Sequence, residues 1–126
     1  MNFFFNVSFF IFISGLHHLG WVHLDIRWEN VIYNPVQKSF VLIDSEFATP
    51  VGYDLPQMDL KTISKIDLSK IDKQYYPKEK KATPEFDWHA IGIMIQGLIP
   101  VPQELSKYVN PFLSFNLSQI EEVLKP

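Results

Sequence analysis

Residues 23–34, HLDIRWENVIYN, place four polar side chains at a fixed spacing within an otherwise apolar stretch. The four are His23, Asp25, Arg27 and Asn30. The residues that follow predict a β-hairpin, with strands at Val31–Tyr33 and Ser39–Ile43, a turn at Asn34–Pro35 and an acidic tip at Asp44. The chain is therefore expected to hold a polar loop beside a small hairpin.

Two apolar runs are expected to supply the core. Residues 3–19 are apolar on every face, so periodicity leaves open whether they form a buried helix or a buried strand. The run WHAIGIMIQGLI, residues 88–99, has the length of a buried helix. Asp87 stands before it as an N-capping acid, and two prolines follow it.

The rest of the chain is expected to be less regular. Residues 49–86 contain prolines and seven lysines, which predicts a long solvated segment that includes Pro84 and Glu85 as loop residues. A short helix near Ile63–Ile71 is an option within it. A capping box at Ser118–Glu121 predicts a short C-terminal helix.

Composition excludes several kinds of site. The 126-residue chain contains no cysteine, so disulfides, zinc–thiolate sites and cysteine nucleophiles are ruled out. Catalysis would have to rely on carboxylates, histidines or hydroxyls. The formal net charge of −3 gives no electrostatic reason to expect nucleic acid or an anionic membrane as the partner. The length is that of one domain, or of part of a larger one.

The apolar N-terminal run also bears on location. Residues 3–16 are fewer than a transmembrane helix requires. The run lacks a preceding Lys or Arg and the small-residue cleavage site of a signal peptide. We therefore expect a cytoplasmic protein, and secretion or membrane anchoring through these residues is the less favoured alternative.

The polar residues fit a catalytic motif. His23, Asp25 and Asn30 match H-x-D-x-x-x-x-N, and the second predicted strand delivers Asp44 fourteen positions after Asn30. With Asp87 at the start of a buried helix, this order of parts resembles the protein kinase-like superfamily. Phosphoryl transfer requires a carboxylate beside the acceptor hydroxyl and hard oxygen ligands for Mg²⁺, and these residue types supply both.

The resemblance implies a role for each residue that would take part in the chemistry. Asp25 corresponds to the aspartate that orients the acceptor hydroxyl and accepts its proton. Arg27 stands where a basic residue contacts the transferring phosphate. Asn30 and Asp44 correspond to the ligands of the Mg²⁺ that binds with ATP.

Other residues correspond to supports of the loop. His23 is expected to brace the loop rather than to move protons. Asp87 is expected to hold the loop through its backbone amide groups, with Gly92 at the family's D-x-x-x-x-G spacing. His17 and His18 have no partners at ligand spacing, so we expect no metal role for them.

The chain also departs from the family pattern. Leu24 replaces the arginine of H-R-D, which removes the pairing with a phosphorylated loop, and Asp44-Ser45-Glu46 replaces D-F-G. No glycine-rich loop or V-A-I-K lysine occurs, and only 22 residues precede His23, so the N-terminal lobe is expected to be absent. LIDSEFA resembles aminoglycoside and choline kinases. D-I-R-W-x-N resembles divergent kinase-like domains of fungi and oomycetes, including Crinkler effectors, and we favour that branch.

The expected fold is therefore α+β: a truncated protein kinase-like C-terminal lobe over residues 1–126, mostly helical, with one small hairpin that carries the catalytic loop. The expected function is ATP- and Mg²⁺-dependent phosphoryl transfer to a protein Ser/Thr-type hydroxyl, incomplete in this chain alone. Exposed apolar residues and a protein substrate or partner chain are expected with it. Two alternatives stay open, an inactive pseudokinase or binding fragment and a small-molecule phosphotransferase.

Overall fold

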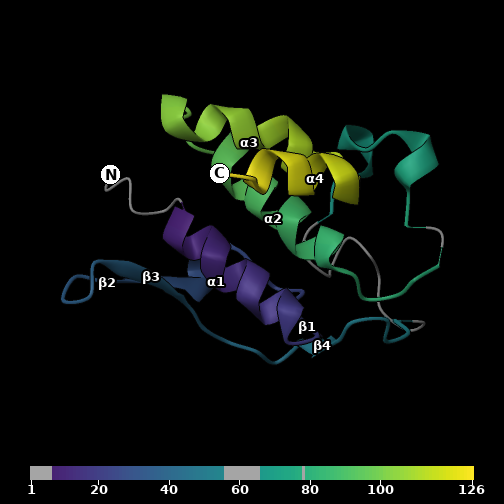
Figure 1. Ribbon diagram of the computed structural model, residues 1–126, viewed down its shortest axis with the longest axis horizontal. Coiled ribbons are helices and arrows are strands. Elements are labelled where there is room, and N and C mark those ends of the chain that lie inside the picture. The colour runs from purple at the N-terminus through teal and green to yellow at the C-terminus, as the bar shows by residue number, and fades with distance from the viewer. Residues whose placement is uncertain (1–6, 56–65, 78) are drawn as a thin grey trace.

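The computed structural model describes residues 7–55, 66–77 and 79–126, and these form an α+β arrangement, as the sequence predicts (Figure 1). The helices of this part of the chain are α1 (Val7–His18), α2 (Pro84–Gln96), α3 (Gln103–Leu113) and α4 (Leu117–Leu124). Helix α2 lies in the middle, with α1 on one side and the α3–α4 pair on the other (Figure 1).

The strands form two small antiparallel sheets. Strand β1 (Trp21–Val22) pairs with β4 (Thr49–Pro50), and β2 (Val31–Asn34) pairs with β3 (Ser39–Leu42). The β2–β3 pair confirms the predicted hairpin. The expected position of Asp44 at its tip is wrong, because residues 35–38 form the turn and Asp44 follows the other end of β3.

The apolar N-terminal run forms helix α1 from Val7 onward, which decides the choice between helix and strand; residues 3–6 lie outside the described part. One face of the helix is buried through Phe9, Phe10 and Ile13, while other apolar side chains of the helix are exposed. The chain then reverses at Gly20, whose φ of +92° suits a residue without a Cβ atom.

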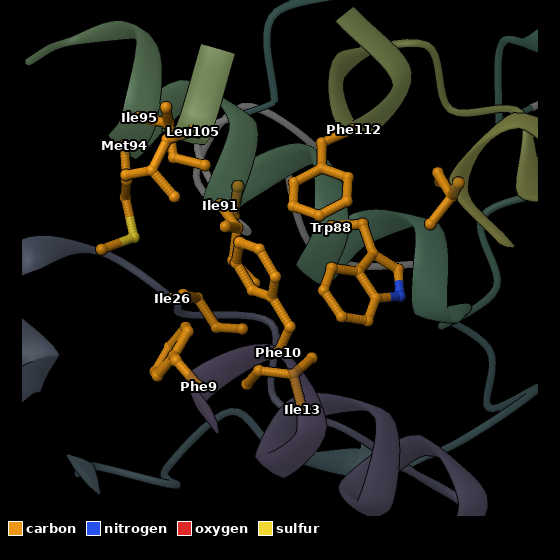
Figure 2. Packing of buried hydrophobic residues seen from close by; sticks show 12 residues of the cluster. Phe9, Phe10, Ile13, Ile26, Trp88, Ile91, Met94, Ile95, Leu105 and Phe112 are labelled. Carbon is orange, nitrogen blue, oxygen red and sulfur yellow. The ribbon is translucent and has the colours of Figure 1, made fainter. Parts of the chain in front are cut away.

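The main core joins α1 to α2 and α3 (Figure 2). The ring of Phe10 meets those of Trp88 on α2 and Phe112 on α3 edge-on, at centroid distances of 6.0 and 5.1 Å. Ile26 from the polar loop points into the same cluster (Figure 2). The apolar core therefore anchors the loop from one side.

Three expectations about element boundaries are wrong. Helix α2 begins at Pro84 rather than after Asp87, because proline suits the first helical position, so Pro84 and Glu85 belong to the helix. Asp87 consequently lies inside the first turn. Asn116, not Ser118, caps α4 and accepts hydrogen bonds from the Ser118 and Gln119 amides.

Between β4 and α2, the described residues of the irregular segment form short turns and one β-bridge, which joins Asp54 to Lys81. Of the option at Ile63–Ile71, residues 63–65 lie outside the described part, and the rest contains a 3-10 turn, η2 (Leu68–Lys70), rather than an α-helix. Further 3-10 turns are η1 (Trp28–Asn30) and η3 (Lys73–Tyr75). In η2 and η3 the side chain of the preceding aspartate accepts an amide hydrogen bond, which favours a tight turn over a longer helix.

His89 ties this segment to the helices. Its side chain is fully buried, its Nε2 accepts a hydrogen bond from the Asp67 amide at 3.0 Å, and its Nδ1 lies 3.0 Å from the Leu113 carbonyl. Because one nitrogen must accept while the other donates, the ring is neutral. Burial lowers the pKa of His89 below its usual value of 6.5, against smaller opposing effects of Leu113 and Asp67.

Gly92→Ala is expected to lower the free energy of unfolding by about 1–3 kcal/mol through overpacking. A Cβ atom there would lie 3.0 Å from Leu113 Cγ and 3.1 Å from Phe112 Cβ, where α2 and α3 are in contact. Gly15→Ala is the matched control, because nothing lies within 4 Å of its added Cβ and alanine favours a helix. Urea denaturation should move the two midpoints in opposite directions, and a Gly92→Ala midpoint at or above that of the parent chain would contradict the close packing.

His89 should make the fold less stable in mild acid. The pKa of His89 is lowered in the folded chain. Below about pH 6.5 the unfolded chain therefore binds more protons than the folded chain. The free energy of unfolding then decreases as the pH decreases, by at most about 1.4 kcal/mol per pH unit. The stabilising contribution is complete above that pH. In urea denaturation from pH 7 to pH 5, the stability difference between the parent chain and His89→Gln should shrink. His18→Gln, at an exposed site, is the control and should keep the parent's pH dependence.

Candidate catalytic loop

The carboxylate of Asp87 is the central hydrogen-bond acceptor of the site. It is fully buried in the first turn of α2. Its Oδ2 accepts from the His23 amide at 2.9 Å and its Oδ1 from the Leu24 amide at 2.9 Å. These bonds join two segments that are more than sixty residues apart, and they fix the start of the polar loop against α2.

A third group, the imidazole of His17 on α1, also reaches this carboxylate. Its Nε2 lies 2.7 Å from Asp87 Oδ2. Because a carboxylate only accepts, the Nε2 atom carries the proton. The sequence did not predict this contact. Ligand spacing relates residues that are close together in the chain, and no local pattern indicates a partner seventy positions away.

His23 links the loop to the end of the hairpin. Its Nδ1 accepts from the Asp25 amide at 3.1 Å, and its Nε2 lies 3.2 Å from the Ile43 carbonyl, to which it can donate. The Ile43 amide in turn donates to the Asn30 carbonyl at 2.8 Å. Both contacts end at the residue before Asp44, so the loop and the candidate metal ligand share one hydrogen-bonded frame.

Asp25 and Asn30 form a close pair inside the loop, and both are buried. Asn30 Nδ2 donates to the Asp25 carbonyl at 2.8 Å and to Asp25 Oδ2 at 2.9 Å. The amide nitrogen is therefore fully used, which leaves the Asn30 Oδ1 atom as a hard acceptor. The remaining carboxylate oxygen of Asp25 lies 3.3 Å from Arg27 Nε, an ion pair without hydrogen-bond geometry.

Arg27 belongs to the loop, and its side chain is 38% exposed, whereas Asp25 and Asn30 are buried. Besides Asp25, it approaches Glu29, with 3.6 Å between Nη1 and Oε2. It also lines a cavity of about 220 Å³ together with Trp28, Glu29 and Met94. The guanidinium can therefore exchange partners without unfolding the loop.

The backbone is in the left-handed region at both ends of the loop. Leu24 has φ of +69° and Asp44 has φ of +59°, and neither is glycine. Such conformations cost energy and persist where surrounding contacts enforce them, commonly at functional sites. The Leu24 side chain is buried with Phe86 and Phe115 in a second apolar cluster, so the position that carries arginine in H-R-D is here part of the core.

The donor set fits a hydrated Mg²⁺ better than a closed metal cage. Among residues 7–55, 66–77 and 79–126, no group of three or more His, Asp and Glu side chains could hold a metal ion. Asp44 is exposed, and its Oδ1 accepts a 3.3 Å bond from the Glu46 amide, while Asn30 offers Oδ1. Mg²⁺ usually takes one or two protein oxygens and completes its shell with water and substrate phosphates. Asn30 and Asp44 are suited to that kind of binding.

The loop thus gathers His23, Asp25, Arg27 and Asn30. Asp87 accepts the loop's backbone hydrogen bonds, and Asp44 follows Ile43, whose amide donates to the Asn30 carbonyl. Within the described residues, no helix combines the length and the hydropathy needed to cross a membrane. Comparison of the chain with protein-family models, curated proteins and solved structures found no match.

Asp87→Asn should destabilise the fold by about 3 kcal/mol, because an amide offers only one acceptor oxygen and turns an N–H group toward a buried backbone donor. Asp72→Asn is the control, since Asp72 accepts a single exposed bond from the Gln74 amide. Urea denaturation gives the stabilities. Hydrogen exchange of the His23 and Leu24 amides should accelerate in Asp87→Asn alone, and unchanged protection there would contradict the role assigned to this carboxylate.

Proposed function

We propose that the chain is the catalytic-loop part of a protein kinase-like phosphotransferase that uses ATP and Mg²⁺ and acts on a protein hydroxyl. The observation that carries the proposal is the pair of hydrogen bonds from the His23 and Leu24 amides to Asp87. A buried carboxylate that accepts from two consecutive backbone amides fixes the position of the next residue, Asp25. A catalytic carboxylate needs this kind of fixed placement.

In this proposal Asp25 orients the acceptor hydroxyl and takes its proton. The Asn30 amide group, 2.9 Å from Asp25 Oδ2, holds the carboxylate in one rotamer and leaves Oδ1 for the substrate. Asn30 and Asp44 would hold the Mg²⁺. The bound Mg²⁺ and ATP supply the phosphoryl group and neutralise its charge.

Arg27 would change partner during the reaction. In the structure it pairs with Asp25 and Glu29. A phosphate is a stronger bidentate partner for guanidinium than these two carboxylates, which lie 3.3 and 3.6 Å from the Arg27 nitrogens, so Arg27 would turn to the transferring group. That movement frees the Asp25 Oδ1 atom for the acceptor hydroxyl.

The exposed face of the hairpin supports the binding-fragment alternative, or a partner chain for the enzyme. Ile32 and Val41 are cross-strand neighbours and are 51% and 39% exposed, and Ile43 beside them is 40% exposed. Apolar side chains gathered in this way commonly mark a contact surface. The cytoplasm remains the location we propose.

The test is Mg²⁺-dependent ATP binding by the intact chain, measured by isothermal titration calorimetry. Asp44→Ala is expected to weaken the affinity at least about tenfold, because loss of a metal-site oxygen typically has that effect. Asp72→Ala, an exposed aspartate remote in sequence, should bind like the parent chain. Asp25→Ala should keep nucleotide binding and lose phosphoryl transfer to a peptide acceptor.

The outcomes separate the proposal from its main alternative. An affinity that requires Mg²⁺ and depends on Asp44 supports the phosphotransferase. No binding at millimolar nucleotide, by a chain whose circular dichroism shows the expected helices, contradicts it and favours the binding fragment.

A further inference from the structure

A second cavity lies on another part of the molecule, between the irregular segment and the start of α2. It has a volume of about 380 Å³. Its walls come from the η3 turn and the residues after it, from the first turn of α2, and from the loop between α3 and α4. None of the residues given a role in phosphoryl transfer lines it.

The charged group of interest in this cavity is Glu85, in the first turn of α2. Its side chain is partly buried, and no cation lies within ion-pair distance of its carboxylate in the described part of the chain. Burial raises the pKa of Glu85, and the nearby Glu121 adds to this, while its own amide, the Thr83 hydroxyl and His17 oppose it. The Thr83 contact lacks full hydrogen-bond geometry. A desolvated carboxylate without a counter-charge is costly, and a bound cation would offset that cost.

The other walls suit an organic cation rather than a hydrated metal ion. Tyr75, Tyr76 and Phe115 offer apolar ring surface, on which a flat guanidinium or an aliphatic stem can pack. Gln74 adds an amide oxygen. Two carboxylates, Glu85 and the rim residue Glu79, among aromatic and amide groups are not a metal site, in keeping with the lack of any cluster of three such ligands in the described residues.

Among the described residues, one cation borders the cavity, and it has its own partner. Lys81 Nζ lies 3.9 Å from Glu79 Oε2, and both side chains are largely exposed. This rim pair is nearly neutral as a unit and is screened by solvent. It therefore does little to compensate the carboxylate of Glu85.

From these observations we propose that the cavity binds a guanidinium or alkylammonium group, with Glu85 as its counter-ion and the aromatic wall as its packing surface. Such a group is carried by arginine or lysine side chains of a peptide and by free amines of the same chemistry. The proposal does not depend on phosphoryl transfer.

The cavity is physically connected to the catalytic loop. Glu85 precedes Asp87 by two positions in the first turn of α2, and His17, which contacts Asp87, also influences Glu85 electrostatically. A cation at Glu85 would therefore bind to the same helical turn that carries the acceptor of the loop's backbone bonds. Basic residues of a bound peptide would be held by the same helix that fixes the loop.

The experiment is a titration of the isotope-labelled intact chain with N-acetyl-arginine amide, followed by the NMR signals of the cavity backbone. Saturable shifts are expected at Tyr75, Tyr76 and Asn116. N-acetyl-citrulline amide is the matched ligand, of nearly the same shape without the charge, and should cause no saturable shift. A short alanine-based peptide with one central arginine is the second probe.

Glu85→Gln should weaken binding of the arginine amide about tenfold or more, as expected for loss of a charged hydrogen bond. Glu104→Gln, at an exposed position in the first turn of α3 that does not line the cavity, is the matched control and should bind like the parent chain. Because Glu85→Gln removes a desolvated charge, its urea midpoint should be at or above the parent's, and loss of binding cannot then be ascribed to unfolding.

Each outcome has a definite meaning. Binding that requires both the guanidinium and Glu85 supports the proposal; a tighter peptide then points to a peptide source, and an equal affinity to a free amine. Equal shifts with citrulline, equal affinity in Glu85→Gln, or no saturable shift at tens of millimolar ligand overturns it. ATP binding by Glu85→Gln is measured in parallel, so that failure here is distinguishable from failure of the phosphotransferase proposal.

Discussion

The carboxylate of Asp87 is fully buried, and the position of the polar loop depends on the hydrogen bonds that it accepts. Removing a charge from water is costly unless donors replace the water. Two backbone amides and the imidazole of His17 are those donors. The first turn of α2 also favours a negative charge, because its amide dipoles point toward it. The loop, α1 and α2 are thus held together through one side chain.

The remaining contacts carry this constraint along the loop to the hairpin. His23 joins the Asp25 amide to the Ile43 carbonyl, and Asn30 is bound to Asp25 on one side and to Ile43 on the other. Two left-handed residues, Leu24 and Asp44, mark the ends of this frame. Their conformational cost is of the order of 1–3 kcal/mol each, so the frame must be well supported by the packing of Ile26 and Leu24 in the two cores.

Local patterns in the sequence predicted the hairpin and the helical nature of residues 88–96, because alternation and apolar runs are short-range signals. The roles that motif spacing gives to the candidate site residues stay predictions. Long-range contacts could not be predicted in this way. The His17–Asp87 pair and the role of His89 depend on how helices pack. Helix α3 was missed because it is polar on one face and contains Pro111 near its end. The start of α2 was placed too late because Asp87 resembles a capping residue, whereas its carboxylate accepts from the loop instead.

The hairpin has two different faces, and this determines how a ligand could reach the site. Val31, Phe40 and Leu42 pack on the main core, so the strand alternation leaves Ile32 and Val41 on the outer side. Ile43 and Asp44 continue from that exposed edge, whereas Asp25 and Asn30 are buried against the core. Helix α2 therefore holds the loop in place, and a ligand would reach the loop from the edge of the hairpin.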